Sequence, residues 1–282
     1  MTDVQPVRTQ YLSVGDARLA YDDEGGTGPL IVAVPGMGDL RSEYRALSPY
    51  LTRAGYRVVT MDVRGFGETS AIWGDYSAKA VGWDIARLIE HLDSGPAVVL
   101  GNSFAAGAAL WAARERPAEV SAVVLLGPIV RDSPPNWFGK LAIKAGFAGP
   151  WRVWFWMTYW NSLFSSRRPE DHGLAREALR ANLKESGRMD ALRIMVSLSK
   201  LETEGMLGPG LARALVVMGT RDPDFKDPTA EAEWLAQTLG SQCLMVQDAG
   251  HYPHLERADL VGSAIIAYLN EIGISRFATA SP

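Results

Sequence analysis

The sequence contains a single cysteine, Cys243, among its 282 residues. One thiol cannot form an intramolecular disulfide bond, and it argues strongly against a zinc site built from thiolates. Cys243 stands in the run Ser241-Gln242-Cys243-Leu244-Met245-Val246, for which we predict a buried strand.

An excess of positive charge is also absent. The formal net charge is -4, the isoelectric point is about 5.6, and no block of Lys and Arg occurs along the chain. Proteins that bind nucleic acid normally concentrate such cations on one face to contact phosphates. We therefore expect no nucleic-acid partner.

The sequence has neither a recognisable secretion signal nor an uninterrupted apolar span. Residues 1–6 lack the charged-then-apolar pattern of a signal peptide, so we expect a cytoplasmic protein. The most apolar stretch, 141–160, is interrupted by Lys144, Pro150 and Arg152. Two charges and a helix break predict a buried or interfacial segment without stable membrane insertion.

What the sequence does contain is an alternation of short apolar runs with amphipathic stretches, which is typical of βαβ units and a mostly parallel sheet. We predict strands over 11–14, 18–21, 30–34, 56–61, 97–100, 120–126, 214–218 and 243–246, the first two as an antiparallel pair. We predict helices over 41–53, 81–92, 229–239 and 260–272. The sheet pattern stops from residue 127 to about 210, where helical stretches over 174–183 and 191–201 predict an insertion.

The pentapeptide Gly101-Asn102-Ser103-Phe104-Ala105 directly follows one of these apolar runs and precedes a helix rich in small residues. This pattern predicts a strand, a sharp turn and a helix, with the serine at the positive end of the helix dipole. The strand end and the helix start pass close together at such a turn, so Gly101 and Ala105 must be small. The stretch resembles the nucleophile elbow of the α/β-hydrolase fold, with Ala105 in place of the usual glycine.

Other segments extend the resemblance over nearly the whole chain outside the insertion. Residues 62–70, Asp-Val-Arg-Gly-Phe-Gly-Glu-Thr-Ser, resemble the family's Asp-x-Arg-Gly-x-Gly-x-Ser loop, and residues 250–253 resemble its Gly-His-x-Pro loop. The chain is identified as a lid-bearing serine hydrolase of the α/β-hydrolase superfamily. The resemblance implies an α/β fold with a mostly parallel eight-stranded sheet flanked by helices. It divides the chain into core (1–127), helical lid or cap (128–210), core (211–275) and a flexible tail (276–282).

The resemblance also implies a catalytic triad. Among four histidines, His251 stands in the turn between a strand and a helix that suits the base. Asp222 stands at the family's Gly-x-x-Asp position and ranks first as the acid, ahead of Asp224 and then Asp132. The chain order Ser103, Asp222, His251 is the order found in this fold.

A metal site is a second interpretation of the same region. His251, His254 and Glu256 could be read as three ligands, but Pro253 interrupts the helical register that such a set would need. We expect His254 to support the loop structurally, and we expect neither a metal nor a cofactor.

An acyl transition state needs hydrogen-bond donors aimed at its oxyanion. The resemblance implies the backbone N–H of Phe104, next to the serine, and that of Met37 in the loop Pro35-Gly36-Met37-Gly38-Asp39. Proline replaces the histidine that the family has at the start of this loop.

The predicted lid is rich in aromatic residues, of which most should pack the lid and a few should contact substrate: Trp137, Phe147, Trp151, Trp154, Phe155, Trp156, Tyr159 and Trp160. We predict hydrolysis of a carboxylic ester or lactone with an apolar or aromatic portion, through an acyl-enzyme. The alternative is C–C bond hydrolysis in a diketone-like compound. Perhydrolase or haloperoxidase side activity and a non-catalytic binding protein rank lower. Relatives that open epoxides carry aspartate at the elbow, so Ser103 argues against that reaction. We expect a small-molecule substrate and a monomer or homodimer.

Overall fold

The computed structural model describes residues 8–132 and 137–275. The predicted tail, 276–282, lies outside the described residues. No helix within the described ranges is long enough and apolar enough to cross a membrane.

Within these ranges, eight strands form one sheet in the order β1-β2-β4-β3-β5-β6-β7-β8. They span Gln10–Val14 (β1), Ala17–Asp23 (β2), Leu30–Val34 (β3), Arg57–Met61 (β4), Ala97–Asn102 (β5), Val120–Leu126 (β6), Ala214–Gly219 (β7) and Gln242–Val246 (β8). β2 pairs antiparallel with β1 and with β4, whereas all other neighbours pair parallel. The predicted mostly parallel eight-stranded sheet is therefore confirmed, including its antiparallel opening pair.

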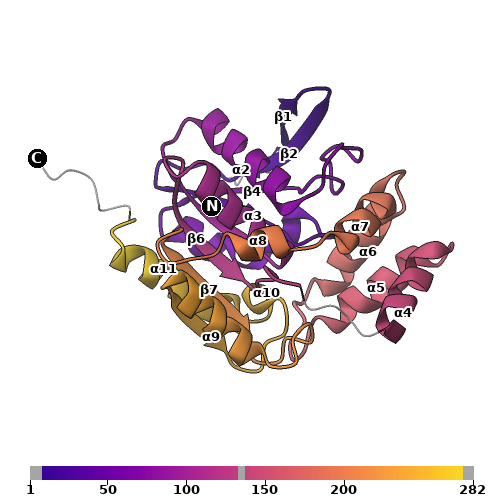
Figure 1. The fold of residues 1–282 in the computed structure, drawn as a ribbon. Helices are drawn as coiled ribbons and strands as arrows, with labels where there is room; N and C mark the ends of the chain where they lie inside the picture. The colour runs from indigo at the N-terminus through magenta and orange to yellow at the C-terminus, as the bar shows by residue number, and fades with distance from the viewer. Residues whose placement is uncertain (1–7, 133–136, 276–282) are drawn as a thin grey trace, which may run out of the picture.

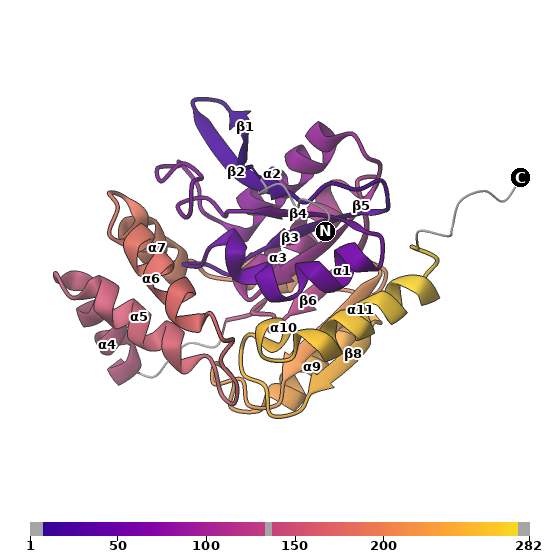
Figure 2. The same cartoon turned by 180° about the vertical axis from the view of Figure 1, so that it is seen from behind.

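Helices cover both faces of the sheet, which explains why its central strands are continuous apolar runs. Every residue of β3, β5 and β7 is buried. Figure 1 shows the face covered by α2 (Ala78–Leu92) and α3 (Phe104–Glu115), and α9 (Pro228–Leu239) packs in the same hydrophobic core. Figure 2 shows the face covered by α1 (Ser48–Arg53) and α11 (Ala258–Glu271).

Two local expectations differ from the structure. The helix predicted over 41–53 is a 3-10 helix, η1 (Arg41–Ala46), followed by the separate helix α1. Proline lacks a backbone N–H and fits only the first turn of a helix, so Pro49 begins a new helix instead of continuing one. Cys243 is exposed, not buried, because β8 is the edge of the sheet and pairs only with β7.

Between β6 and β7, the described residues form five helices: α4 (Trp137–Ala148), α5 (Arg152–Ser162), α6 (His172–Leu183), α7 (Arg188–Ser197) and α8 (Leu201–Gly205). We call this segment the helical insertion. Its helices α4 to α7 project to one side of the sheet (Figures 1 and 2), while α8 returns to α3, where Trp111 donates to Thr203. The domain boundaries at 128 and 210 stay predictions.

Candidate active site

Ser103 lies at the sharp turn between β5 and α3. Its backbone adopts φ 55° and ψ -120°, a region that residues other than glycine rarely occupy and that costs about 1–3 kcal/mol. Hydrogen bonds hold the turn, from the Ser103 N–H to the Leu126 carbonyl (2.9 Å) and from the Ile129 N–H to the Ser103 carbonyl (3.2 Å). A Cβ atom on Gly101 would lie 2.3 Å from the Ala105 carbonyl oxygen, which confirms the steric need for glycine there.

Asn102 connects this turn to the loop that carries His251. Its Nδ2 atom donates to the carbonyl oxygens of Leu126 (3.0 Å) and His251 (3.3 Å). Among the described residues, the hydroxyl of Ser103 makes no hydrogen bond to the imidazole of His251. Hydrogen bonds between a nucleophile and its base often tighten only when substrate is bound.

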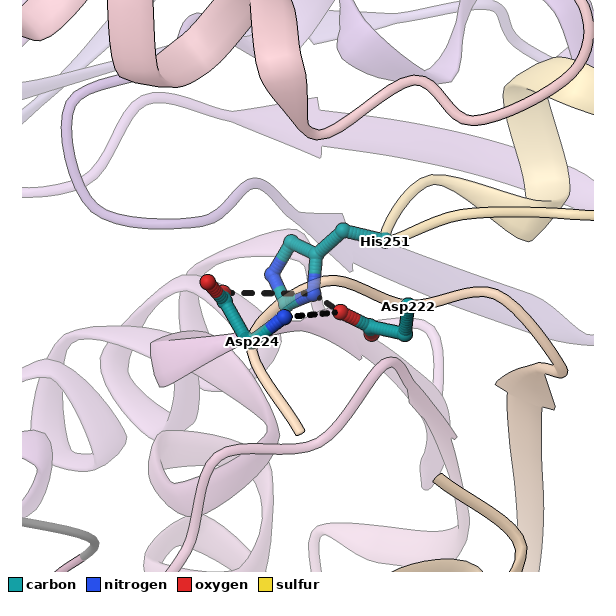
Figure 3. A group of neighbouring side chains, drawn as sticks. All are labelled: Asp222, Asp224 and His251. Atoms are coloured by element: carbon teal, nitrogen blue, oxygen red, sulfur yellow. Dashed lines mark hydrogen bonds and ion pairs between the residues drawn. The ribbon is translucent and has the colours of Figure 1, made fainter. Parts of the chain in front are cut away.

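Two carboxylates face the Nδ1 atom of His251, as Figure 3 shows. Asp222 Oδ2 lies 2.7 Å away in a hydrogen bond, and Asp224 Oδ2 lies 3.6 Å away. His251 and Asp222 are both buried. Asp132, the third candidate for the acid, is instead bonded to the Ser199 hydroxyl (2.6 Å) and the Lys200 N–H (3.0 Å). The structure therefore brings the first-ranked and second-ranked carboxylates to the histidine.

The charges around His251 favour its protonated form. Burial by itself lowers the pKa of the imidazole, but the negative charges of Asp222 and Asp224 outweigh burial and raise the pKa to about 9. Burial raises the pKa of Asp224, as does the charge of Asp222, while the charge of His251 and the hydroxyl of Tyr159 oppose the rise. The site can thus stabilise an imidazolium strongly.

Residues 35–39, called here the oxyanion loop, follow β3 and lie against Ser103. A Cβ atom on Gly36 would lie 3.2 Å from the Cβ of Ser103 and 3.0 Å from Asn102 Oδ1, so glycine lets the loop approach the serine without displacing these atoms. Within the described chain, the N–H groups of Met37 and Phe104 donate to no protein acceptor. Two unpaired donors therefore stand in the segments that adjoin the serine.

A buried acid and histidine hold the start of the oxyanion loop. The Gly36 N–H donates to Glu43 Oε2 (3.1 Å), and Glu43 Oε1 lies 2.9 Å from His254 Nε2. Burial raises the pKa of Glu43 to about 8 and lowers that of His254 to about 3. His254 thus supports the oxyanion loop through Glu43, whereas the sequence led us to expect that it supports the adjacent loop, 248–253.

The three residues considered as alternative metal ligands, His251, His254 and Glu256, contact different partners. Glu256 accepts from the N–H groups of Gly250 (2.8 Å) and Ser166 (3.0 Å), whereas His254 contacts Glu43. Pro253 starts the short helix α10 (Pro253–Glu256), so His251 lies before the helix that carries His254 and Glu256. In the described residues, the group of three histidine and carboxylate side chains whose ligand atoms lie close together is His251, Asp222 and Asp224.

Three aromatic side chains of α5 donate to the active-site loops, a role that the sequence did not reveal. Trp156 Nε1 donates to the Gly38 carbonyl (3.2 Å), and Trp160 Nε1 donates to Asp39 Oδ2 (2.7 Å). The Tyr159 hydroxyl donates to Asp224 (2.8 Å). The spacing of these residues, i, i+3 and i+4 on one helix, is the sequence signal that could have indicated a shared face.

A cavity of about 150 Å³ begins beside Phe104, between the core and the helical insertion. Phe104, Ile129, Met195 and Leu198 belong to the apolar part of its lining, and the polar part comes from Ser77, Lys79, Ser199, Lys200, Glu202 and Thr203. This cavity offers room for a small group beside Phe104, the residue that follows Ser103.

Comparison with known protein families shows to which family the chain belongs. The family model described as alpha/beta hydrolase fold matches residues 29–258. The chain belongs to the α/β-hydrolase fold family. As a member of that family, it is 27% identical over 267 residues to "Putative non-heme bromoperoxidase BpoC" of Mycobacterium tuberculosis, which covers 90% of this chain and 98% of the relative.

Other members of the family are similar over part or all of this hydrolase-fold chain. Epoxide hydrolase B of Mycobacterium tuberculosis is 30% identical over 138 residues, 45% of this chain and 39% of that protein. An esterase from Thermogutta terrifontis superposes with a TM-score of 0.74 at 24% identity, covering 94% of this chain and 99% of its own. The enol-lactonase from Burkholderia xenovorans LB400 superposes with a TM-score of 0.76 at 22% identity, covering 93% and 100%. At these identities, the two solved structures establish the fold.

Proposed function

We propose that this α/β hydrolase cleaves a carboxylic ester or lactone with an apolar or aromatic portion, using Ser103 as nucleophile. The observation that carries the proposal is the strained turn at Ser103, which adjoins the unpaired N–H groups of Met37 and Phe104. A strained turn is retained only where the surrounding structure enforces it, and such turns cluster at functional sites. The hydrogen-bonded pair of Asp222 and His251 supplies the base.

In the first step, His251 Nε2 takes the proton of the Ser103 hydroxyl while the serine oxygen attacks the carbonyl carbon. The carbon–oxygen π electrons move onto the carbonyl oxygen, and the N–H groups of Met37 and Phe104 donate to the resulting oxyanion. Asp222 accepts from Nδ1–H and stabilises the imidazolium. Asp224 adds a second negative charge at 3.6 Å.

The tetrahedral intermediate then collapses by breaking the bond to the alcohol oxygen, which receives the proton from His251 Nε2. The product is an acyl-enzyme on Ser103. Water, deprotonated by the same imidazole, attacks the acyl carbon and releases the carboxylic acid. The proton returns to Ser103, so the enzyme is regenerated.

The substrate class rests on the cavity and on the names of similar proteins. Phe104 follows Ser103 and Ile129 is hydrogen-bonded to it, so these two side chains give the cavity an apolar end that favours an apolar or aromatic group. An esterase and an enol-lactonase share the fold, in line with ester or lactone cleavage. Epoxide hydrolase B is also similar, but the expected nucleophile for epoxide opening is aspartate, and this chain has Ser103.

The proposal is tested with an active-site-directed fluorophosphonate and a panel of aryl esters, aryl lactones and vinylogous diketones. We expect stoichiometric labelling of the wild-type protein, no labelling of Ser103→Ala, and turnover of the esters or lactones that falls by about 10³-fold or more in the variant. Full esterase activity in Ser103→Ala would contradict the proposal. Turnover of the diketones alone would assign C–C bond hydrolysis instead.

A second candidate is perhydrolysis, which the name of the mycobacterial bromoperoxidase favours. In that reaction, hydrogen peroxide replaces water in the attack on the acyl-enzyme and releases a peracid, which can then oxidise bromide. Bromination of a phenol red indicator that requires peroxide, a carboxylic acid and Ser103 would support it. Bromination that persists in Ser103→Ala would exclude this route.

A further inference from the structure

Helix α5 contacts the active-site loops through the polar edges of its aromatic side chains. Trp156 and Trp160 lie one turn apart, and their indole N–H groups donate to successive residues of the oxyanion loop, Gly38 and Asp39. Tyr159, on the same face, donates to Asp224 beside His251. Side chains at i, i+3 and i+4 point the same way, so one face of α5 meets two loops of the site.

The oxyanion loop is shaped to receive the first of these tryptophans. Gly38 adopts φ +71°, and a Cβ atom there would lie 2.7 Å from the Trp156 ring. Glycine is therefore required both for the backbone conformation and for the approach of the indole. The buried ring lies directly against the backbone that its N–H group holds.

Asp39 links the second tryptophan to the histidine loop. Its buried carboxylate accepts from the Leu40 N–H (2.8 Å), Trp160 Nε1 (2.7 Å) and the Tyr252 hydroxyl (2.9 Å). Within the described chain, no basic side chain forms an ion pair with it. Because a buried carboxylate needs such donors, losing the Trp160 N–H would leave Asp39 poorly satisfied. Tyr252 directly follows His251, so this carboxylate ties the oxyanion loop to the loop of the proposed base.

Met37 lies between two held positions of the same loop. On one side, the Gly36 N–H donates to Glu43. On the other side, the Gly38 carbonyl accepts from Trp156, and the Asp39 N–H donates back to the Gly36 carbonyl (3.3 Å). These bonds fix the backbone around Met37 and leave its own N–H unpaired among the described residues.

We propose that Trp160 and Trp156 are positioning residues that hold the oxyanion loop through Asp39 and Gly38, and so aim the Met37 N–H at the transition-state oxyanion. This inference rests on the proposed function. It assigns the aromatic face of α5 a task in catalysis beyond packing or forming the wall of a pocket. A helix of the insertion, far from Ser103 in sequence, thereby sets the geometry of the donor group.

The test is Trp160→Phe, which removes the indole N–H and keeps an aromatic ring against His172 and Phe164. We expect kcat to fall by about 5- to 50-fold, less than the 10²- to 10³-fold loss of an oxyanion donor itself, with KM changed less than about twofold. The inhibition constant of an arylboronic acid, whose adduct with Ser103 places an oxygen in the oxyanion site, should rise by the same factor as kcat falls. The matched control is Trp154→Phe on the same helix, where the indole is 69% exposed and wild-type values are expected.

Two further variants keep the inference testable if Trp160→Phe folds poorly. Tyr252→Phe removes another donor from Asp39, and Asp39→Asn keeps the side-chain shape while replacing one acceptor oxygen by an NH₂ group that cannot accept. Both should show the same selective loss of boronate affinity. Trp160→Phe should add little to Asp39→Asn, because both changes act on one contact.

Three outcomes would overturn the inference. The folded variants could have wild-type kcat and boronate affinity, KM could rise by the same factor as the inhibition constant of the boronic acid, or the effects could be additive in the double variant. Circular dichroism and thermal melting establish folding in each case. Failure of the wild-type protein to react with the fluorophosphonate would instead reject the proposed function. A labelled wild-type enzyme with an unaffected Trp160→Phe variant would reject the positioning role alone.

Discussion

Asp224 places a second carboxylate 3.6 Å from the Nδ1 atom of His251, beside the 2.7 Å hydrogen bond that Asp222 accepts from it. With both charges present, the pKa of His251 rises to about 9. The neutral imidazole is the form that can take a proton from serine. At pH 7, only about 1% of a group with that pKa is neutral.

The first prediction therefore concerns the pH dependence of the proposed esterase. In the wild-type protein, kcat/KM should increase with pH and level off above about pH 9, because deprotonation of His251 generates the base. Asp224→Asn removes one negative charge, so the pKa of His251 should fall and the profile should move to lower pH. The variant should consequently be more active than the wild type at pH 7. Profiles of kcat/KM between pH 5 and 10 measure the shift, and superimposable profiles would contradict it.

The second prediction separates the three candidate carboxylates. Asp222→Asn should reduce kcat by about 10³- to 10⁴-fold, because the amide cannot stabilise the imidazolium and favours the wrong tautomer. Asp224→Asn should retain activity with the altered pH profile. Asp132→Asn serves as the control, because Asp132 accepts hydrogen bonds from Ser199 and Lys200 and, within the described chain, not from His251. This substitution should leave kcat unchanged. A severe loss in Asp224→Asn with a mild loss in Asp222→Asn would reverse the assignment of the acid.

Local sequence patterns predicted the eight strands and the turn at Ser103, because the periodicity of apolar residues and the positions of glycines determine structure over a few neighbouring residues. The same patterns placed Asp222 and His251 after successive strands, which a parallel sheet brings to one edge. They could not predict the bond between Asp39 and Trp160, which are 121 residues apart. That contact depends on how the helical insertion packs against the core, and no local pattern specifies such packing.

The prediction that Cys243 is buried was wrong. Its apolar neighbours suggested a buried strand, yet burial depends on the place of a strand in the sheet as well as on its composition. β8 is an edge strand, so Cys243 is exposed.

The third prediction concerns the steric limit at the elbow. Gly101→Ala should lower the thermal stability and abolish fluorophosphonate labelling, because its Cβ would lie 2.3 Å from the carbonyl oxygen of Ala105. Backbone atoms cannot move aside cheaply, so we expect a cost above about 2 kcal/mol. Gly74→Ala is the matched control, since no atom lies within 4 Å of its Cβ position. Equal melting temperatures and equal labelling of the two variants would refute the close approach.

Glu43 is the basis of the last prediction, because it is buried and anchors the oxyanion loop through the Gly36 N–H. Burial raises the pKa of its carboxyl in the folded protein to about 8, whereas the unfolded chain should titrate near 4.3. Between these values, the folded state retains a proton that the unfolded state has released. The linkage relation then requires that this group make folding less favourable as the pH rises from about 4.3 to 8, by at most about 1.4 kcal/mol per pH unit.

Glu43→Gln removes this titration and keeps both contacts, because the amide oxygen can accept from Gly36 while its NH₂ group donates to His254 Nε2. The difference in unfolding free energy between variant and wild type should therefore shift in favour of the variant from pH 5 to pH 8. Urea unfolding of both proteins at pH 5, 6.5 and 8 measures this difference, and comparison of the pair cancels the titration of other groups. A difference independent of pH would mean that Glu43 is ionised in the folded protein throughout this range. In that case, the negative charge itself would hold the Gly36 N–H, and Glu43→Gln should weaken boronate binding as strongly as Trp160→Phe does.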